Sequence, residues 1–186
     1  MVQKTLPSLH TQAYEYRVQV LAHCAKAGTL FPANPPNEVF LDSRRAFQIM
    51  QPPKGRILCT ENDQDIRELI AWVLTNHGFD VIGTESADQA IDLARAQHFD
   101  LYLVDSSMPP LSGTELTKKL REFDTRTPIL FYSGAALDAD KENARLAGAQ
   151  GYLVKPVDND ALIAKVVRLI ADAEIAVLRE PLTPSK

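Results

Sequence analysis

Five short runs rich in β-branched or apolar residues recur after Gly55, and a helical pattern follows each of them. The runs are Arg56–Thr60, Asp80–Thr84, Leu101–Val104, Ile129–Ser133 and Gly151–Val154. Between them, apolar residues repeat every three or four positions, as on one face of a helix. Five such units in about 120 residues predict an α/β fold, a parallel sheet with helices on both faces.

Residues at the ends of the helical patterns agree with this interpretation. Gly78 follows the first pattern, where a glycine commonly ends a helix, and Ser86 is placed to cap the second. The last pattern carries Leu162, Val166, Leu169 and Ile170 at helical spacing. We therefore expect each strand to be followed by its own helix.

The composition excludes several classes of protein. With 45% hydrophobic and 24% charged residues in 186, the chain can bury a substantial core. No apolar run approaches the roughly 20 residues of a membrane span, and the first ten residues lack the apolar core of a signal peptide. Two cysteines, Cys24 and Cys59, are too few for a disulfide framework or a zinc site. We expect a cytoplasmic protein without a membrane partner.

The charge is distributed unevenly along the chain. Residues 1–54 hold six Lys and Arg against three Asp and Glu, whereas residues 55–186 hold 14 against 21. An acidic module has no electrostatic footprint for a phosphate backbone, and the basic segment is too sparse to supply one. Nucleic acid is therefore not an expected partner.

We expect residues 1–54 to form an N-terminal extension, residues 55–175 the main domain and residues 176–186 a tail. The extension holds one amphipathic helical pattern, from about Thr11 to Lys26, and then a proline-rich linker. Two hypotheses account for it. Either the helix docks on the acidic domain, or translation begins at Met50, six residues before the first strand.

Polar residues follow four of the predicted strands. In a parallel sheet the ligand site lies at the carboxyl ends of the strands, so these side chains should converge. They are Glu61, Asn62, Asp63, Asp105, Ser133 and Lys155. Neighbouring carboxylates repel, and a divalent cation relieves the repulsion; hard oxygen ligands are those Mg²⁺ prefers.

This set suits phosphoryl transfer onto a carboxylate. Asp105 would be the nucleophile, a metal would screen the charge, and Lys155 and the Ser133 hydroxyl would bind the phosphoryl oxygens. The four histidines have no partnered nucleophile motif, and there is no glycine-rich phosphate loop.

Four motifs occur in order along the domain: RILCTENDQDIREL, DLYLVDSSMPPLSG, TPILFYSG and GYLVKP. The stretch from Arg56 to about Ala173 thereby resembles the receiver domain of bacterial two-component response regulators. The resemblance implies a flavodoxin-like, doubly wound sheet of five strands in the order 2-1-3-4-5. It also implies roles for five residues: Asp105 as the phosphorylated aspartate, Ser133 as the switch hydroxyl, Tyr152 as the aromatic that changes rotamer, Lys155 as the phosphate-binding lysine, and Ser107 as a backbone carbonyl ligand of Mg²⁺.

The sequence departs from the family pattern after the first strand, where two adjacent acids are usual and Glu61 and Asn62 stand here. Asn62 is at the position expected to touch Mg²⁺ directly, and Glu61 is expected to reach a metal-bound water. An amide brings no charge, so metal binding should weaken unless Asp63 compensates. Alternatively, Glu61 or Asn62 caps the following helix, and Tyr152 is packed aromatic surface.

The expected function is a phosphorylation-dependent signal relay by a stand-alone receiver, not an enzyme, that takes part in phosphotransfer onto its own Asp105. The donor would be a sensor histidine kinase or a phosphotransfer protein, and a downstream protein would bind the altered face near Tyr152. The alternative, motivated by Asn62, is a pseudo-receiver that binds partners without phosphorylation. A flavin-binding domain of the same fold is disfavoured by the acidic first turn.

Overall fold

The computed structural model describes residues 53–179. The predicted helix from Thr11 to Lys26, its linker and Met50 lie outside the described residues. All five predicted strands are present with the predicted bounds: β1 Arg56–Thr60, β2 Asp80–Thr84, β3 Leu101–Val104, β6 Ile129–Ser133 and β7 Gly151–Val154. They form one parallel sheet in the order β2-β1-β3-β6-β7, which confirms the predicted order.

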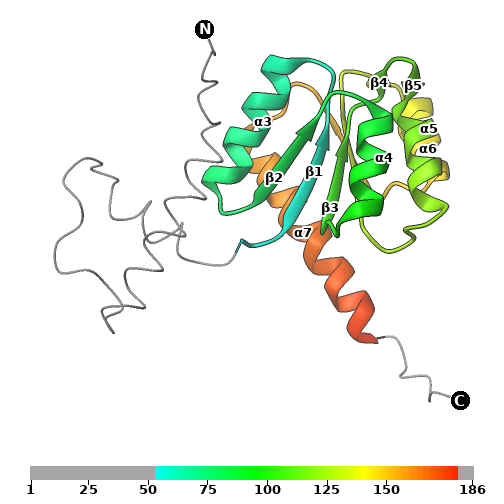
Figure 1. Cartoon of the computed structure of the whole chain (residues 1–186). Coiled ribbons are helices and arrows are strands. Elements are labelled where there is room, and N and C mark those ends of the chain that lie inside the picture. The colour runs from blue at the N-terminus through cyan, green and yellow to red at the C-terminus, as the bar shows by residue number, and fades with distance from the viewer. Residues whose placement is uncertain (1–52, 180–186) are drawn as a thin grey trace, which may run out of the picture. The chain divides into compact units, whose positions relative to one another are not determined.

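Within residues 53–179, five helices cover the sheet: α3 Gln64–Asn76, α4 Ala87–Ala96, α5 Gly113–Arg121, α6 Asp138–Ala147 and α7 Asn159–Arg179. Helices α3 and α7 pack on one face, and α4, α5 and α6 on the other (Figure 1). Ser86 caps α4 through a hydrogen bond from the Gln89 amide, as predicted. Gly78, just after α3, has φ 91°, a conformation that L side chains rarely adopt.

The central strands are buried on both faces, which explains why they could be recognised in the sequence. In β1, Ile57 and Cys59 belong to the core under α3 and α7, while Leu58 belongs to the core under α4, α5 and α6. Every residue of β3 is buried. A strand covered on both sides is apolar at successive positions rather than at alternate ones.

Two features were not predicted. A small antiparallel pair, β4 Ser107–Met108 and β5 Leu111–Ser112, follows β3 and leads into α5. Helix α7 runs on to Arg179, beyond residue 175 where the domain was expected to end. No helix within residues 53–179 is both long and apolar enough to cross a membrane.

Candidate functional site

The register of the sheet brings the two acidic strand ends together. Thr60, the last residue of β1, is paired with Val104, the last residue of β3. The amide of the next residue, Asp105, donates to the Thr60 carbonyl at 3.0 Å. From β1 the chain adds β2 on one side and then β3 on the other, so the strand order reverses between β1 and β3. Open parallel sheets bind their ligands at such a reversal, at the carboxyl ends of the strands.

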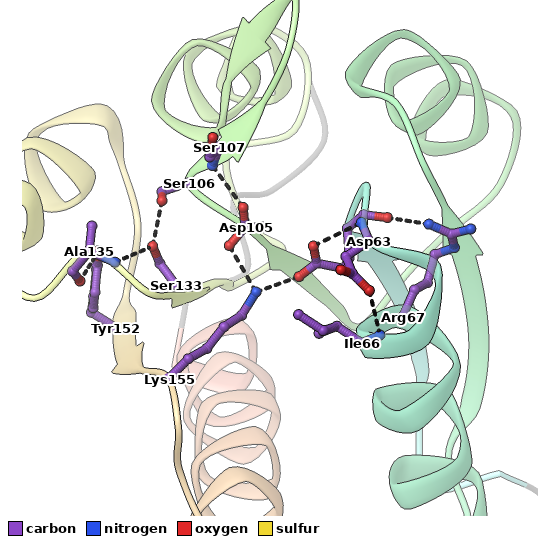
Figure 2. A network of polar contacts seen from close by, with 11 residues as sticks. Asp63, Ile66, Arg67, Asp105, Ser106, Ser107, Ser133, Ala135, Tyr152 and Lys155 are labelled. Atoms are coloured by element: carbon purple, nitrogen blue, oxygen red, sulfur yellow. Dashed lines mark hydrogen bonds and ion pairs between the residues drawn. The ribbon is translucent and has the colours of Figure 1, made fainter.

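Lys155 bridges the two carboxylates (Figure 2). Its Nζ lies 2.5 Å from Glu61 Oε2 and 3.0 Å from Asp105 Oδ1. Both acids are buried, with Glu61 3% and Asp105 8% exposed. One cation therefore faces two carboxylates, and with both acids ionised the trio carries a net negative charge in a place where an uncompensated charge is unfavourable.

The protonated form of Lys155 is favoured by this arrangement. Partial burial by itself lowers the pKa of the ammonium group, but the hydrogen bonds to Glu61 and Asp105 and their negative charges outweigh it. The pKa of Lys155 is therefore raised above its ordinary value. The lysine remains a cation at neutral pH and is available to an anion that approaches Asp105.

The second oxygen of Asp105 is held by the turn that follows it. The Ser107 amide donates to Asp105 Oδ2 at 2.8 Å, and the Gly113 amide donates to the Ser106 carbonyl at 3.0 Å. A Cβ at Gly113 would lie 2.2 Å from the Asp105 carbonyl oxygen, so no larger residue fits there without a backbone shift. The carbonyl of Ser107 as a metal ligand remains a prediction.

Ser133, the last residue of β6, is the next side chain of the site. Its side chain is completely buried, and its hydroxyl is hydrogen-bonded to the hydroxyl of Ser106 and accepts from the Ala135 amide at 3.0 Å. The orientation of this hydroxyl is therefore set by the residue directly after Asp105 and by the loop after β6.

Tyr152 is attached to the same loop. Its hydroxyl donates to the Ala135 carbonyl at 2.9 Å, and its ring stacks on Phe131 with 5.7 Å between centroids. The backbone of Ala135 thus accepts from Tyr152 and donates to Ser133 (Figure 2). A movement of the Ser133 hydroxyl can therefore affect Tyr152 through the backbone of Ala135. The switch roles of Ser133 and Tyr152 remain predictions.

The two residues after Glu61 have separate roles. Asn62 is exposed. Asp63, not Glu61 or Asn62, caps α3, since its carboxylate accepts from the Ile66 amide at 3.0 Å. The alternative that Glu61 or Asn62 is the cap is therefore wrong, because the helix begins at Gln64 and the cap is the residue immediately before it. With this bond to the helix, Asp63 already has a structural role.

The oxygens at these strand ends match Mg²⁺ in kind. Carboxylates of Glu61 and Asp105, the Asn62 amide and the Ser107 carbonyl are all hard oxygen ligands. Two of these four groups carry a charge, so the set offers a dication little negative charge. No group of three His, Cys, Asp or Glu side chains placed to hold a metal occurs within residues 53–179. The metal ligands remain a prediction.

Sequence reasoning missed two contacts of the site. Arg67, on α3, donates to the Glu61 carbonyl at 2.5 Å, and its stem packs against Gly83 of β2, where a Cβ would lie 3.1 Å from it. Ser106 holds the Ser133 hydroxyl. The position of Ser106 directly after Asp105 was a usable signal, whereas Arg67 has none in the sequence.

The comparisons with known proteins agree on one family. The family model for the response regulator receiver domain matches residues 57–167. Among curated proteins, the cell cycle response regulator CtrA of Brucella ovis is 35% identical over 115 residues, which cover 62% of this chain and 50% of that protein. The match thus spans about half the length of these curated relatives.

Solved structures show the same architecture. The receiver domain of Francisella response regulator 1452 is 27% identical with a TM-score of 0.61, over 64% of this chain and 98% of that one. The receiver domain of the sensor histidine kinase PA1611 from Pseudomonas aeruginosa is 30% identical with a TM-score of 0.59, over 63% and 98%. That structure is described with a magnesium ion in its active-site cleft.

Proposed function

The chain belongs to the response regulator receiver family, and from this premise we propose that it relays a signal by accepting a phosphoryl group on Asp105. The donor is a sensor histidine kinase or a phosphotransfer protein. The chain is not an enzyme with a separate substrate, because the group that reacts is its own side chain. A downstream protein in the cytoplasm receives the signal.

The observation that carries this proposal is the setting of Asp105. Its carboxylate is buried at a strand end, with a cation 3.0 Å from one oxygen and a backbone amide 2.8 Å from the other. A buried acid beside a second acid is unfavourable unless the site binds something. A phosphoryl group on Asp105 would bring oxygens that Lys155 and Ser133 can bind.

The transfer is a balanced exchange of one bond. A carboxylate oxygen of Asp105 forms a bond to phosphorus while the bond from phosphorus to the donor's histidine nitrogen breaks. The electron pair of the broken bond stays with that nitrogen. Lys155 is placed to stabilise negative charge on the transferred group, and the Ser107 amide keeps the attacking carboxylate in position.

Mg²⁺, when bound, would screen the negative charges of the carboxylates and of the incoming phosphoryl group. The residues that would hold it are Asp105, Asn62, the Ser107 carbonyl and, through a water, Glu61. Asn62 supplies an oxygen without a charge, so we propose weak binding. Glu61 must share its carboxylate with Lys155.

The output follows from the contacts of Ala135. When the Ser133 hydroxyl turns to a phosphoryl oxygen, it gives up its bonds to Ser106 and to the Ala135 amide. Movement of that loop changes the hydrogen bond that holds Tyr152. The surface around Tyr152 is then the face that a partner protein distinguishes.

The test uses a small-molecule phosphodonor, acetyl phosphate, and the intact mass of the full chain. With Mg²⁺, the wild type should gain one phosphoryl group, and Asp105→Asn should gain none. Asp63→Asn is a matched control, because it removes a carboxylate two residues from Glu61 while keeping an oxygen that caps α3. It should be phosphorylated as the wild type is.

Two results would overturn the proposal. One is equal incorporation in the wild type and in Asp105→Asn. The other is a wild-type chain that is folded by circular dichroism and takes up no phosphoryl group, with or without Mg²⁺, which is the outcome expected of a pseudo-receiver.

A further inference from the structure

The side chain of Ser106 lies in the site, but the phosphotransfer described above gives it no task. It comes directly after Asp105 in the chain, and its hydroxyl is hydrogen-bonded to the hydroxyl of Ser133. The Ser106 side chain points toward Ser133, whereas the carboxylate of Asp105 points toward Lys155 (Figure 2). The site therefore holds two hydroxyls in contact beside Asp105, and a role has been proposed for only one of them.

The partners of Ser133 indicate what Ser106 does for it. The Ala135 amide donates to the Ser133 hydroxyl at 3.0 Å, and an amide N–H cannot accept a proton in return. Within residues 53–179, the other hydrogen-bond partner of this side chain is the Ser106 hydroxyl, which is therefore the acceptor for the Ser133 proton. Because Ser133 is completely buried, removing this acceptor would leave a buried donor unpaired.

The backbone of Ser106 is fixed on both sides. Its carbonyl accepts from the Gly113 amide at 3.0 Å, and the amide of the preceding residue, Asp105, donates to the Thr60 carbonyl at 3.0 Å. The packing is also close, since a Cβ at Gly113 would lie 3.0 Å from the Ser106 Cα. The backbone of Ser106 is thus not free to follow Ser133, and the bond between the two hydroxyls breaks when the Ser133 hydroxyl turns toward Asp105.

We propose that Ser106 is a positioning residue that holds Ser133 in its unphosphorylated arrangement and thereby lowers the affinity of the site for a phosphoryl group. This inference rests on the proposed function, in which the Ser133 hydroxyl turns to a phosphoryl oxygen. A contact that is made in only one of two states shifts the equilibrium toward that state. The bond from Ser133 to Ser106 exists only before phosphorylation, so it opposes the movement that phosphorylation requires.

The size of the effect follows from the worth of one hydrogen bond, which corresponds to about a fivefold change in an equilibrium constant. Ser106→Ala should therefore bind a phosphoryl analogue about fivefold more tightly than the wild type. The same variant should be less stable without the analogue, because the Ser133 proton then has no acceptor. Tighter binding by a less stable chain distinguishes a positioning role from general damage to the site, which would weaken both.

The probe is beryllofluoride with Mg²⁺, a stand-in for the phosphoryl group on Asp105, titrated into the ¹⁵N-labelled full chain. The NMR resonance of the Ser107 amide reports binding, because this amide donates to Asp105 Oδ2. Ser106→Ala should reach half saturation at about one fifth of the wild-type concentration. Ser106→Thr, which keeps the hydroxyl, should restore the wild-type value, and urea unfolding without beryllofluoride should show the lower stability of Ser106→Ala.

A double-mutant cycle with Ser133→Ala tests whether Ser106 acts through Ser133. In the Ser133→Ala background, Ser106→Ala should leave the affinity for beryllofluoride unchanged, because the bond that it removes is already absent. Equal affinities of the wild type and Ser106→Ala, or the same gain in both backgrounds, would overturn this inference alone. A wild type that binds no beryllofluoride would overturn the proposed function and this inference together.

Discussion

The ion pairs at the two edges of the sheet differ in their exposure to water. At the amino edge, Arg56 pairs with Asp80 at 2.9 Å, and its side chain is 43% exposed. At the carboxyl edge, Lys155 is enclosed between two buried acids. The first arrangement leaves its charges in contact with water and contributes little to stability. The second leaves a buried excess of negative charge, which is unfavourable unless the site binds something, so this difference supports the proposed site.

Removing the shared cation should have the largest effect. Lys155→Met should lower the free energy of unfolding by about 3 kcal/mol, because it leaves two buried carboxylates facing each other without a counter-ion. Urea unfolding without divalent cations measures this. At the opposite edge, Arg56→Met should cost about 1 kcal/mol or less, because its pair is half exposed. Equal losses at the two edges would contradict the comparison.

The raised pKa of Lys155 predicts a loss of stability in alkali. The folded state holds the proton more tightly than the unfolded chain does, so this contribution is fully present below the ordinary lysine pKa of 10.5. It disappears as the pH rises through the higher folded-state value. Urea unfolding from pH 9 to 12 should show a steeper decline in the wild type than in Lys155→Met, and parallel curves would count against the bridge.

Adding a third acid should strengthen metal binding. Asn62→Asp should tighten Mg²⁺ binding roughly tenfold, since a carboxylate attracts a dication more than an amide does. Because Asn62 is exposed, its replacement should hardly change stability without metal. Gln64→Asp, which adds the same charge at the exposed start of α3, is the control for titration by calorimetry. If both variants titrate like the wild type, Asn62 is not a metal ligand.

Asp63 should have a purely structural effect, the smallest of the series. Asp63→Ala removes the side-chain cap of α3 and should cost about 1 kcal/mol of unfolding free energy. Its Mg²⁺ affinity should stay within twofold of the wild type, and Asp63→Asn should recover most of the stability. A large loss of Mg²⁺ affinity in Asp63→Asn would make Asp63 a ligand and move the acidic cluster one residue along the chain.

The central strands β1, β3 and β6 were predictable to the residue because burial on both faces makes them continuous apolar runs. The positions of Asp105, Ser133 and Lys155 followed from the strand ends in the same way. The Lys155 bridge did not, because a long side chain can reach either acid or solvent, and only the packed site selects between them. The cap at Asp63 could be assigned only from the structure, because Glu61, Asn62 and Asp63 all suit a helix start. The end of α7 at Arg179 also came from the structure, because Pro181 predicts where a helix ends only to within a few residues.

The central claim is that Asp105, and no other residue, carries the phosphoryl group. Borohydride reduces an aspartyl phosphate to homoserine, which peptide mass spectrometry locates in the sequence. After incubation with acetyl phosphate and Mg²⁺, the account predicts homoserine at position 105 alone, and none in the Asp105→Asn variant. Homoserine at another position, or its absence from a folded wild-type chain, would contradict the account.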